Sequence, residues 1–169
     1  TGDIVRFHSA SDPRIRLLRN ETCLGVGGAR NRGAAAASGG YFCFLDADDL
    51  LAPRAIEARL QTLQSAHADF CYAWCAQIDE DERILKYCTD ELEPPNFFED
   101  LVRRGNILRN GSCTLMTMEA FAAVGGYSEK LFQAGAQGCE DYKFYLDIAQ
   151  RAKVVCCRET LIGYRVTAT

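Results

Sequence analysis

The chain has 169 residues, which is enough for one domain with a sizeable core, and we expect a single domain over 1–169. Its composition, 48% hydrophobic and 25% charged, is ordinary for a globular protein. The formal net charge is −4, so a nucleic-acid partner is not expected. No apolar run is long enough to span a bilayer, and no secretory signal is visible.

Nine cysteines are spaced irregularly and include no C-x-x-C pair. The only histidines are His8 and His67, so a zinc site is not expected. Several of the cysteines lie in apolar runs, where a free thiol behaves as a small hydrophobic group. We therefore expect reduced thiols in a cytosolic protein.

Helices and strands alternate through the first part of the chain. The predicted elements are a helix over 1–10, a strand over 15–18, a glycine-rich loop over 25–28 leading into a helix through 34–37, a strand over 41–45, a helix opened by Pro53, and a strand over 68–78 with a hairpin partner over 83–88. This alternation predicts a parallel sheet covered by helices on both faces, in three layers.

The later part of the chain mixes element types. It is predicted to contain an acidic loop over 91–96, a helix over 97–103, a strand over 112–116, a helix over 118–124 capped by Thr117 and ended by Gly125 and Gly126, a loop over 131–138, a helix over 140–151, and strands over 153–156 and 161–166. This mixture predicts an antiparallel edge to the sheet.

The acidic run after the strand over 41–45 is the first candidate site. An apolar strand stops there on Asp46, Asp48 and Asp49, and ligands of α/β proteins collect at the carboxyl ends of strands. In extended chain Asp46 and Asp48 lean to the same side, which suits Mg²⁺ or Mn²⁺. Aspartate is also common after strands as a turn former or helix cap, and Asp49 could serve only that purpose.

The glycine-rich segment over 25–33 fits neither common nucleotide-binding fingerprint. A dinucleotide fingerprint needs glycine at Arg30, and a P-loop needs lysine at Ala34. What remains is a helix start that carries Arg30 and Asn31, which can meet a phosphate. An ordinary helix entry with surface arginines fits equally well.

A glycine followed by two acids opens the predicted helix over 140–151. Glu140 and Asp141 at that position suit the helix dipole, which is a sufficient structural reason for them. The functional alternative is a carboxylate base carried into a cleft by a rigid helix.

These features, in this order and spacing, resemble the inverting nucleotide-sugar glycosyltransferases of family 2, which have the GT-A fold. The matching segments lie at 12–16, 28–33 (Gly-Ala-Arg-Asn-Arg-Gly), 44–49 (Phe-Leu-Asp-Ala-Asp-Asp), 124–127, 140–142 and 164–165. The resemblance implies an α/β/α three-layer fold with a mostly parallel sheet and an antiparallel edge. It also implies that the first one or two strands are missing and that the domain is incomplete at its N-terminus.

The resemblance implies a donor and metal site at a D-x-D motif. Asp48 would hold Mn²⁺ or Mg²⁺ on the donor diphosphate, and Asp46 would join it at the metal or contact the ribose or sugar. Arg30 and Asn31 would lie near the donor, expected to be a UDP-, GDP- or dTDP-sugar. Many members have a histidine shortly after the Tyr-Arg pair, where this chain has Thr167.

The resemblance also implies the catalytic base. Asp141 would deprotonate an acceptor hydroxyl, and Glu140 would support the acceptor or orient Asp141. The acceptor would be a saccharide, lipid or protein, selected by the loops over 91–110 and 131–138. We expect a cytoplasmic protein of cell-envelope polysaccharide synthesis, at the inner face of the membrane if absent regions attach it peripherally.

Two other functions fit the residues. The first is a nucleotidyltransferase of related architecture, which would need a basic, glycine-rich signature ahead of residue 1. The second is a truncated or degenerate module that binds without catalysis.

Overall fold

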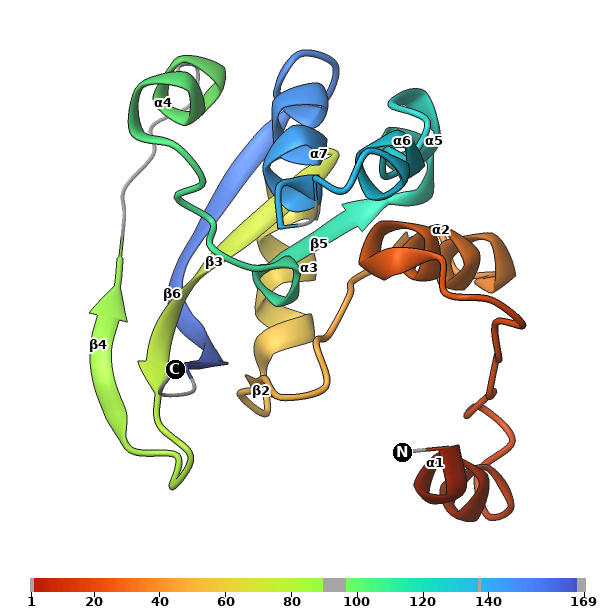
Figure 1. Ribbon diagram of the computed structural model, residues 1–169. Helices are drawn as coiled ribbons and strands as arrows, with labels where there is room; N and C mark the ends of the chain where they lie inside the picture. The colour runs from red at the N-terminus through yellow and green to blue at the C-terminus, as the bar shows by residue number, and fades with distance from the viewer. Residues whose placement is uncertain (1, 90–96, 137, 167–169) are drawn as a thin grey trace.

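A computed structural model describes residues 2–89, 97–136 and 138–166 (Figure 1). Its centre is a six-stranded sheet in the order β1-β5-β3-β6-β2, with β4 paired to β3. The strands are β1 (Tyr41–Phe42), β2 (Leu50–Leu51), β3 (Phe70–Ile78), β4 (Ile84–Cys88), β5 (Thr114–Thr117) and β6 (Val154–Arg165).

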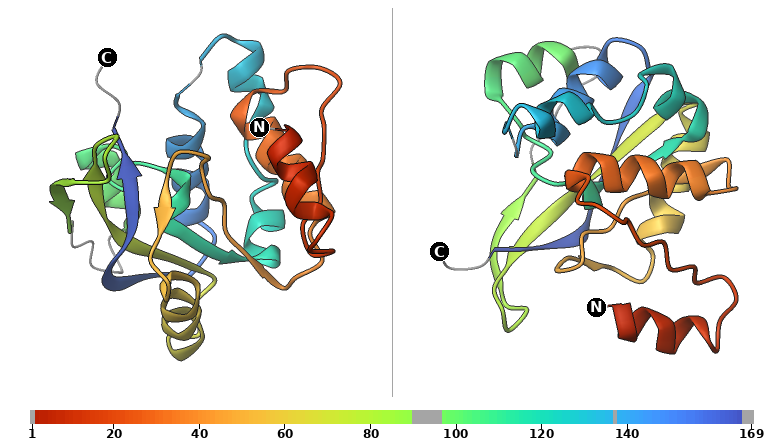
Figure 2. Two further views of the ribbon diagram at one scale, coloured as in Figure 1. Left: turned by 90° about the horizontal axis from the view of Figure 1, so that it is seen from below. Right: turned by 45° about the vertical axis from the view of Figure 1, so that its right-hand side comes forward.

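Helices cover both faces of this sheet. They are α1 (Gly2–Ser9), α2 (Gly25–Ala36), α3 (Ala55–Ser65), α4 (Phe97–Arg104), α5 (Met118–Ala123), α6 (Glu129–Gln133) and α7 (Glu140–Ala149). Helix α3 covers one face, while α2, α4, α5 and α7 contribute to the core on the other (Figures 1 and 2). None of the described helices is long and apolar enough to cross a membrane. The predicted α/β/α three-layer arrangement is confirmed.

Strand β3 separates two cores because successive side chains of a strand point to opposite faces. Phe70 and Tyr72 belong to the core beneath α4 and α7, and Cys71, Ala73 and Cys75 belong to the core beneath α3. The α3 core is built largely from small side chains, cysteines among them, as expected for buried thiols that act as hydrophobic groups.

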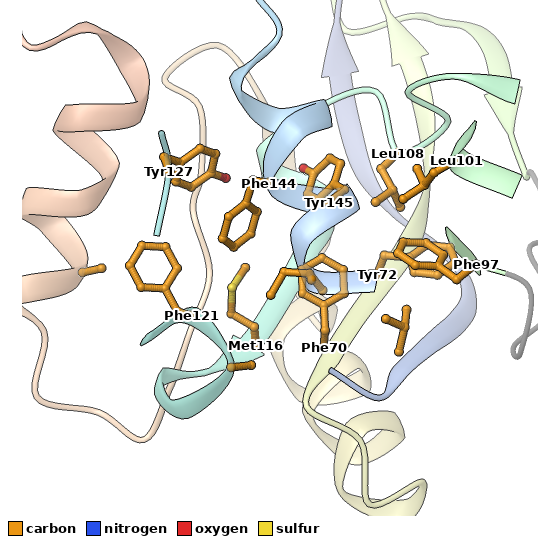
Figure 3. Packing of buried hydrophobic residues seen from close by; sticks show 14 residues of the cluster. Phe70, Tyr72, Phe97, Leu101, Leu108, Met116, Phe121, Tyr127, Phe144 and Tyr145 are labelled. Carbon is orange, nitrogen blue, oxygen red and sulfur yellow. The ribbon is translucent and has the colours of Figure 1, made fainter. Parts of the chain in front are cut away.

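An aromatic cluster anchors α7 to the sheet (Figure 3). Phe144 of α7 stacks on Tyr127 with ring centroids 4.4 Å apart, and Tyr145 meets Phe70 edge-on at 6.0 Å. Such pairs add about 0.5–1.5 kcal/mol each beyond the burial of their area. The first turn of α7, with Glu140 and Asp141, is therefore held in a fixed position.

The sheet of the described strands is mixed: the predicted antiparallel pairing is present, but the prediction that the sheet is mostly parallel is wrong. Only β3 and β6 pair in parallel, and the other four pairings are antiparallel. Strands β1, β3 and β6 run one way, but β5 runs the opposite way between β1 and β3. Helix–strand alternation indicated the common direction of β1 and β3, and could not indicate that a later strand would separate them.

Several predicted boundaries also differ from the structure. Residues 15–18 form no strand, 25–28 are the first turn of α2 rather than a loop, and β1 is shorter than predicted. Strand β2 was not predicted, since its two residues pair with Ile162 and Gly163, far along the chain. The two closing strands are one strand, β6, whose register against β3 shifts around Trp74. Helix α6 occupies the start of the predicted loop over 131–138.

Candidate active site

One cavity of about 460 Å³ gathers five of the six predicted site residues. It lies between the first half of α2, the loop after β1, the start of α7 and the end of β6. Its lining is Val26, Arg30, Asp46, Asp48, Asn106, Arg109, Asn110, Gly138, Glu140, Asp141, Tyr164, Arg165 and Val166. Residues separated by more than 100 positions in the sequence therefore share one polar cavity.

Arg30 joins the two carboxylate groups of this cavity. Its Nη2 donates to Asp46 Oδ1 at 2.8 Å, and its Nη1 donates to Asp141 Oδ1. The guanidinium carbon lies 5.7 Å from the centroid of the Phe44 ring and 5.2 Å from that of Tyr127. Burial lowers the pKa of Arg30, but Tyr127, Asp141 and Asp46 together raise it by more. Arg30 therefore stays charged between the two acids.

The chain makes room for this guanidinium with glycine. A Cβ atom at Gly111 would lie 2.7 Å from Arg30 Nη2, a distance that real Cβ contacts do not adopt. At Gly27, one turn before Arg30, a Cβ would lie 3.1 Å from Tyr127 Cβ. Glycine at these positions lets the backbone around the site approach closely.

The surroundings of Asp141 shift the pKa of its carboxylate. Burial raises the pKa of Asp141, and the charges of Glu140 and Asp46 raise it further, while Arg30 opposes them. The side chain is 15% exposed, so it is still accessible from the cavity. A carboxylate whose pKa lies nearer to neutrality takes up a proton more readily at the pH of the cell.

The third acid of the run, Asp49, anchors the loop instead of facing the cavity. It is 7% exposed and accepts hydrogen bonds from Ser112 Oγ at 2.6 Å, Asn110 Nδ2 at 3.1 Å and the Arg165 backbone N–H at 3.1 Å. Ser112 Oγ also accepts from the Asp46 N–H at 3.0 Å. Asp49 thus fixes the loop that presents Asp46 and Asp48.

The carboxylates of Asp46 and Asp48 fit a hard divalent cation as a partial ligand set. Arg30 takes one Asp46 oxygen, which leaves Oδ2, and Asp48 is exposed with its carboxylate unbonded in the described part of the chain. Among the described residues, no three His, Cys, Asp or Glu side chains gather into a metal site. One or two carboxylates completed by substrate phosphates and water is the usual arrangement for Mg²⁺.

Asn31 is the predicted site residue that does not line the cavity. Its Nδ2 donates to the Tyr127 carbonyl at 2.9 Å, and its Oδ1 accepts from the Tyr127 N–H at 2.8 Å. These bonds tie α2 to the turn through Gly125 and Gly126, which both have positive φ. A donor contact for Asn31 remains a prediction to which these bonds add no support.

Sequence reasoning gave no role to Arg165, a second cation beside the site. Its Nε donates to the Asp48 carbonyl at 2.9 Å, and its Nη1 donates to the carbonyls of Asp79 at 2.7 Å and Glu80 at 3.1 Å. It therefore joins the D-x-D loop to the β3–β4 turn. The only sequence signal was its place in the Tyr164-Arg165 pair.

Asn106, Arg109 and Asn110 line the cavity from the segment after α4. They lie within the predicted acceptor loop over 91–110, and no finer signal singled them out. Residues 91–96 of that loop and Thr167 lie outside the described residues.

A family model described as Glycosyl transferase family 2 matches residues 1–125, about three quarters of the chain. The chain belongs to this family. The match includes Arg30, Asp46 and Asp48 but ends before Glu140 and Asp141, so the place of those two acids in the site rests on the geometry. Membership favours glycosyl transfer over nucleotidyl transfer and confirms the resemblance stated from the motifs.

Relatives agree with this membership. An uncharacterized glycosyltransferase of Methanocaldococcus jannaschii is 28% identical over 97% of this chain and 55% of its own length. An Escherichia coli protein named UDP-Glc:alpha-D-GlcNAc-diphosphoundecaprenol beta-1,3-glucosyltransferase is 39% identical over 52% of this chain and 35% of its own. The chain spans about half the length of the first of these relatives, and less of the second.

Solved structures support the fold. Staphylococcus aureus TarS 1-349, crystallised in complex with UDP-GlcNAc, superposes with a TM-score of 0.73 over 100% of this chain and 47% of TarS. The two sequences are 13% identical, so the likeness concerns the fold alone.

Proposed function

We propose that the whole protein transfers a sugar from a nucleotide-diphosphate donor to an acceptor hydroxyl, with inversion at the anomeric carbon. The observation that carries the proposal is the Arg30 bridge, which joins the D-x-D carboxylate Asp46 to the candidate base Asp141 in one cavity. On this assignment, the leaving-group site and the proton acceptor lie next to each other. A binding module without catalysis would not need a carboxylate of raised pKa beside the D-x-D loop.

The base carries the bond-forming step. As the acceptor oxygen forms its bond to the anomeric carbon, the hydroxyl proton passes to the Asp141 carboxylate, and the bond from that carbon to the diphosphate oxygen breaks. Proton removal by a positioned carboxylate contributes a factor of roughly 10²–10⁴. A single displacement, with the nucleophile opposite the leaving group, inverts the anomeric configuration.

Asp48, together with Asp46, would hold Mn²⁺ or Mg²⁺ against the donor diphosphate. Such a cation, when bound, stabilises the negative charge that develops on the leaving diphosphate. Arg165 fixes the Asp48 backbone, and Asp49 fixes the loop on its other side. Asn31 holds the Tyr127 turn against α2 through its side-chain hydrogen bonds.

A UDP-sugar is the donor class with the most support, and GDP- and dTDP-sugars fit the same chemistry. The E. coli relative is named for UDP-Glc and for an acceptor sugar on a lipid diphosphate, and TarS was crystallised with UDP-GlcNAc. By extension, we propose a UDP-sugar donor and a saccharide acceptor for this protein.

Replacement of the base tests the reaction. In the full-length protein, Asp141→Asn should lower kcat for sugar transfer by roughly 10²–10⁴, because the amide cannot take the proton. Glu140→Gln, the adjacent control, should have a smaller effect on kcat. Transfer is measured with radiolabelled UDP-glucose, and UDP binding by calorimetry shows that each variant still folds. Normal transfer by Asp141→Asn would refute the assignment of the base.

A further inference from the structure

Tyr127 has a buried hydroxyl group to which the proposed reaction gives no role. The residue ends the segment over 124–127, one of the segments on which the family resemblance rests. It is 2% exposed, and its hydroxyl has no hydrogen-bond partner in the described part of the chain. A buried hydroxyl without a partner costs free energy, and a phenylalanine at this position would avoid that cost. The hydroxyl therefore calls for an explanation.

The position of the Tyr127 ring is fixed by contacts that do not involve its hydroxyl. Phe144 of α7 stacks on the ring with the centroids 4.4 Å apart, and the Arg30 guanidinium carbon lies 5.2 Å from its centroid. The Asn31 side chain binds the Tyr127 backbone N–H at 2.8 Å and its carbonyl at 2.9 Å. All of these contacts would remain if the residue were phenylalanine. They therefore fix the direction of the hydroxyl without using it.

The Tyr127 hydroxyl faces the carboxylate of Asp141. Figure 3 shows the hydroxyl pointing toward α7. Phe144, on which the ring stacks, follows Asp141 by three residues and so lies on the same side of that helix. Burial raises the pKa of Tyr127, and the charge of Asp141 raises it further, so the hydroxyl keeps its proton. The two facing groups are thus a hydrogen-bond donor and a carboxylate that can accept.

The carboxylate of Asp141 is held at one of its two oxygens. Arg30 Nη1 donates to Oδ1, and Oδ2 accepts no hydrogen bond in the described part of the chain. A carboxylate held at one point can turn about its Cβ–Cγ bond, whereas a base must present a defined lone pair to the proton that it removes. Glu140 and Asp46, its acidic neighbours, have no proton to donate when ionised. Tyr127 is a neighbour that can supply the second donor.

We propose that Tyr127 is a positioning residue, whose hydroxyl donates to the Asp141 carboxylate in the substrate complex and so fixes the orientation of the base. The proposal rests on the proposed function, since it requires Asp141 to be the base. Hydrogen bonds of catalytic groups often tighten only in the substrate complex. The Tyr127 hydroxyl, which faces Asp141 without meeting the geometry of a hydrogen bond, needs only such a tightening.

Removal of the hydroxyl alone tests this role. In the full-length protein, Tyr127→Phe should lower kcat for transfer from radiolabelled UDP-glucose to p-nitrophenyl α-D-N-acetylglucosaminide by about tenfold, within the range that misplaced reacting groups cost. The KM for UDP-glucose should not change, because the ring keeps its contacts. Tyr142→Phe is the matched control, since its hydroxyl donates to the Leu101 carbonyl at 2.9 Å. It should lower the urea midpoint of unfolding and leave kcat unchanged.

The double variant of Tyr127→Phe with Asp141→Asn shows whether the hydroxyl acts through the base. If it does, Tyr127→Phe should cost nothing further once the base is absent, whereas independent effects would multiply. Unchanged kcat in Tyr127→Phe, or the same loss in both backgrounds, would overturn the proposal. Normal transfer by Asp141→Asn alone would instead contradict the proposed function. Slow transfer by Asp141→Asn beside normal transfer by Tyr127→Phe would overturn only the role of Tyr127.

Discussion

At the scale of single residues, the site is organised by one cation between two acids. Arg30 is 8% exposed, contacts Asp46 and Asp141 at once, and is flanked by the rings of Phe44 and Tyr127. Removal of a partner from such a buried pair leaves an uncompensated charge, which costs several kcal/mol. Arg30 therefore has two effects, one on the position of the D-x-D loop and one on the pKa of the base.

The second effect predicts a pH shift. Arg30 lowers the pKa of Asp141 against the burial that raises it, so Arg30→Gln should raise that pKa further. A base works only when deprotonated, and activity is lost as pH falls through its pKa. The acid limb of the kcat/KM profile should therefore move to higher pH in Arg30→Gln. Arg30→Lys keeps the positive charge, so it should shift the acid limb less than Arg30→Gln does.

That comparison separates electrostatics from folding. A misfolded variant loses activity at every pH, whereas the predicted change is a displacement of the limb. An acid limb at the same pH in wild type and in an active Arg30→Gln variant would contradict the role of Arg30.

At the scale of elements, α2 and α7 are held by contacts outside the reacting groups. The Asn31 side chain makes two hydrogen bonds to the Tyr127 backbone, and Tyr127 stacks on Phe144 of α7. This chain of contacts places the first turn of α7 relative to α2. The relative orientation of Arg30 and Asp141 follows from it.

Loss of that link should destabilise the fold. Asn31→Ala leaves the Tyr127 N–H and carbonyl without partners, at a cost of about 1–3 kcal/mol in the free energy of unfolding. Urea unfolding of the full-length protein measures it. Asn20→Ala, which removes an exposed contact with Arg32, is the control and should change stability by less than about 0.5 kcal/mol. Equal stability of the two variants would contradict the structural role of Asn31.

Elements with strong local signals could be predicted from the sequence, and those made by distant pairing could not. The cap at Thr117 is present, with its hydroxyl accepting from the Ala120 N–H at 3.1 Å, and the hairpin of β3 and β4 is confirmed. Strand β2 exists only because β6 pairs with it. Its two residues are too few to show an alternating pattern in the sequence, so the strand could not be predicted.

At the scale of the whole molecule, the sheet and its covering helices bring distant motifs to one edge. The loop after β1, the end of β6 and the first turn of α7 meet in the cavity of the candidate active site. Helix α1 takes no part, since it lies apart from the sheet and buries none of its residues (Figure 2). The described domain thus holds the D-x-D loop and the candidate base in one unit.

The site itself was predicted in part. Asp46, Asp48, Glu140 and Asp141 were identified as candidates because acids at a strand end and a helix start have recognisable patterns. The contacts of Arg30 with Asp46 and Asp141 were not predicted, and neither was the contact of Arg165 with the Asp48 carbonyl. Contacts between residues so far apart in the sequence depend on the tertiary fold. A purely structural role for Asp49 was among the alternatives drawn from the sequence, but its contacts with Ser112, Asn110 and the Arg165 backbone were not predicted.

The central claim is that one site binds the donor through Asp48 and carries the base on Asp141. Calorimetric titration of UDP into the full-length protein, with Mn²⁺ or with a chelator, tests it most directly in wild type, Asp48→Asn and Asp141→Asn. We predict metal-dependent binding in wild type and Asp141→Asn, and a loss of at least tenfold in affinity in Asp48→Asn. Binding of UDP that is equally tight with the chelator, or in Asp48→Asn, would contradict the account.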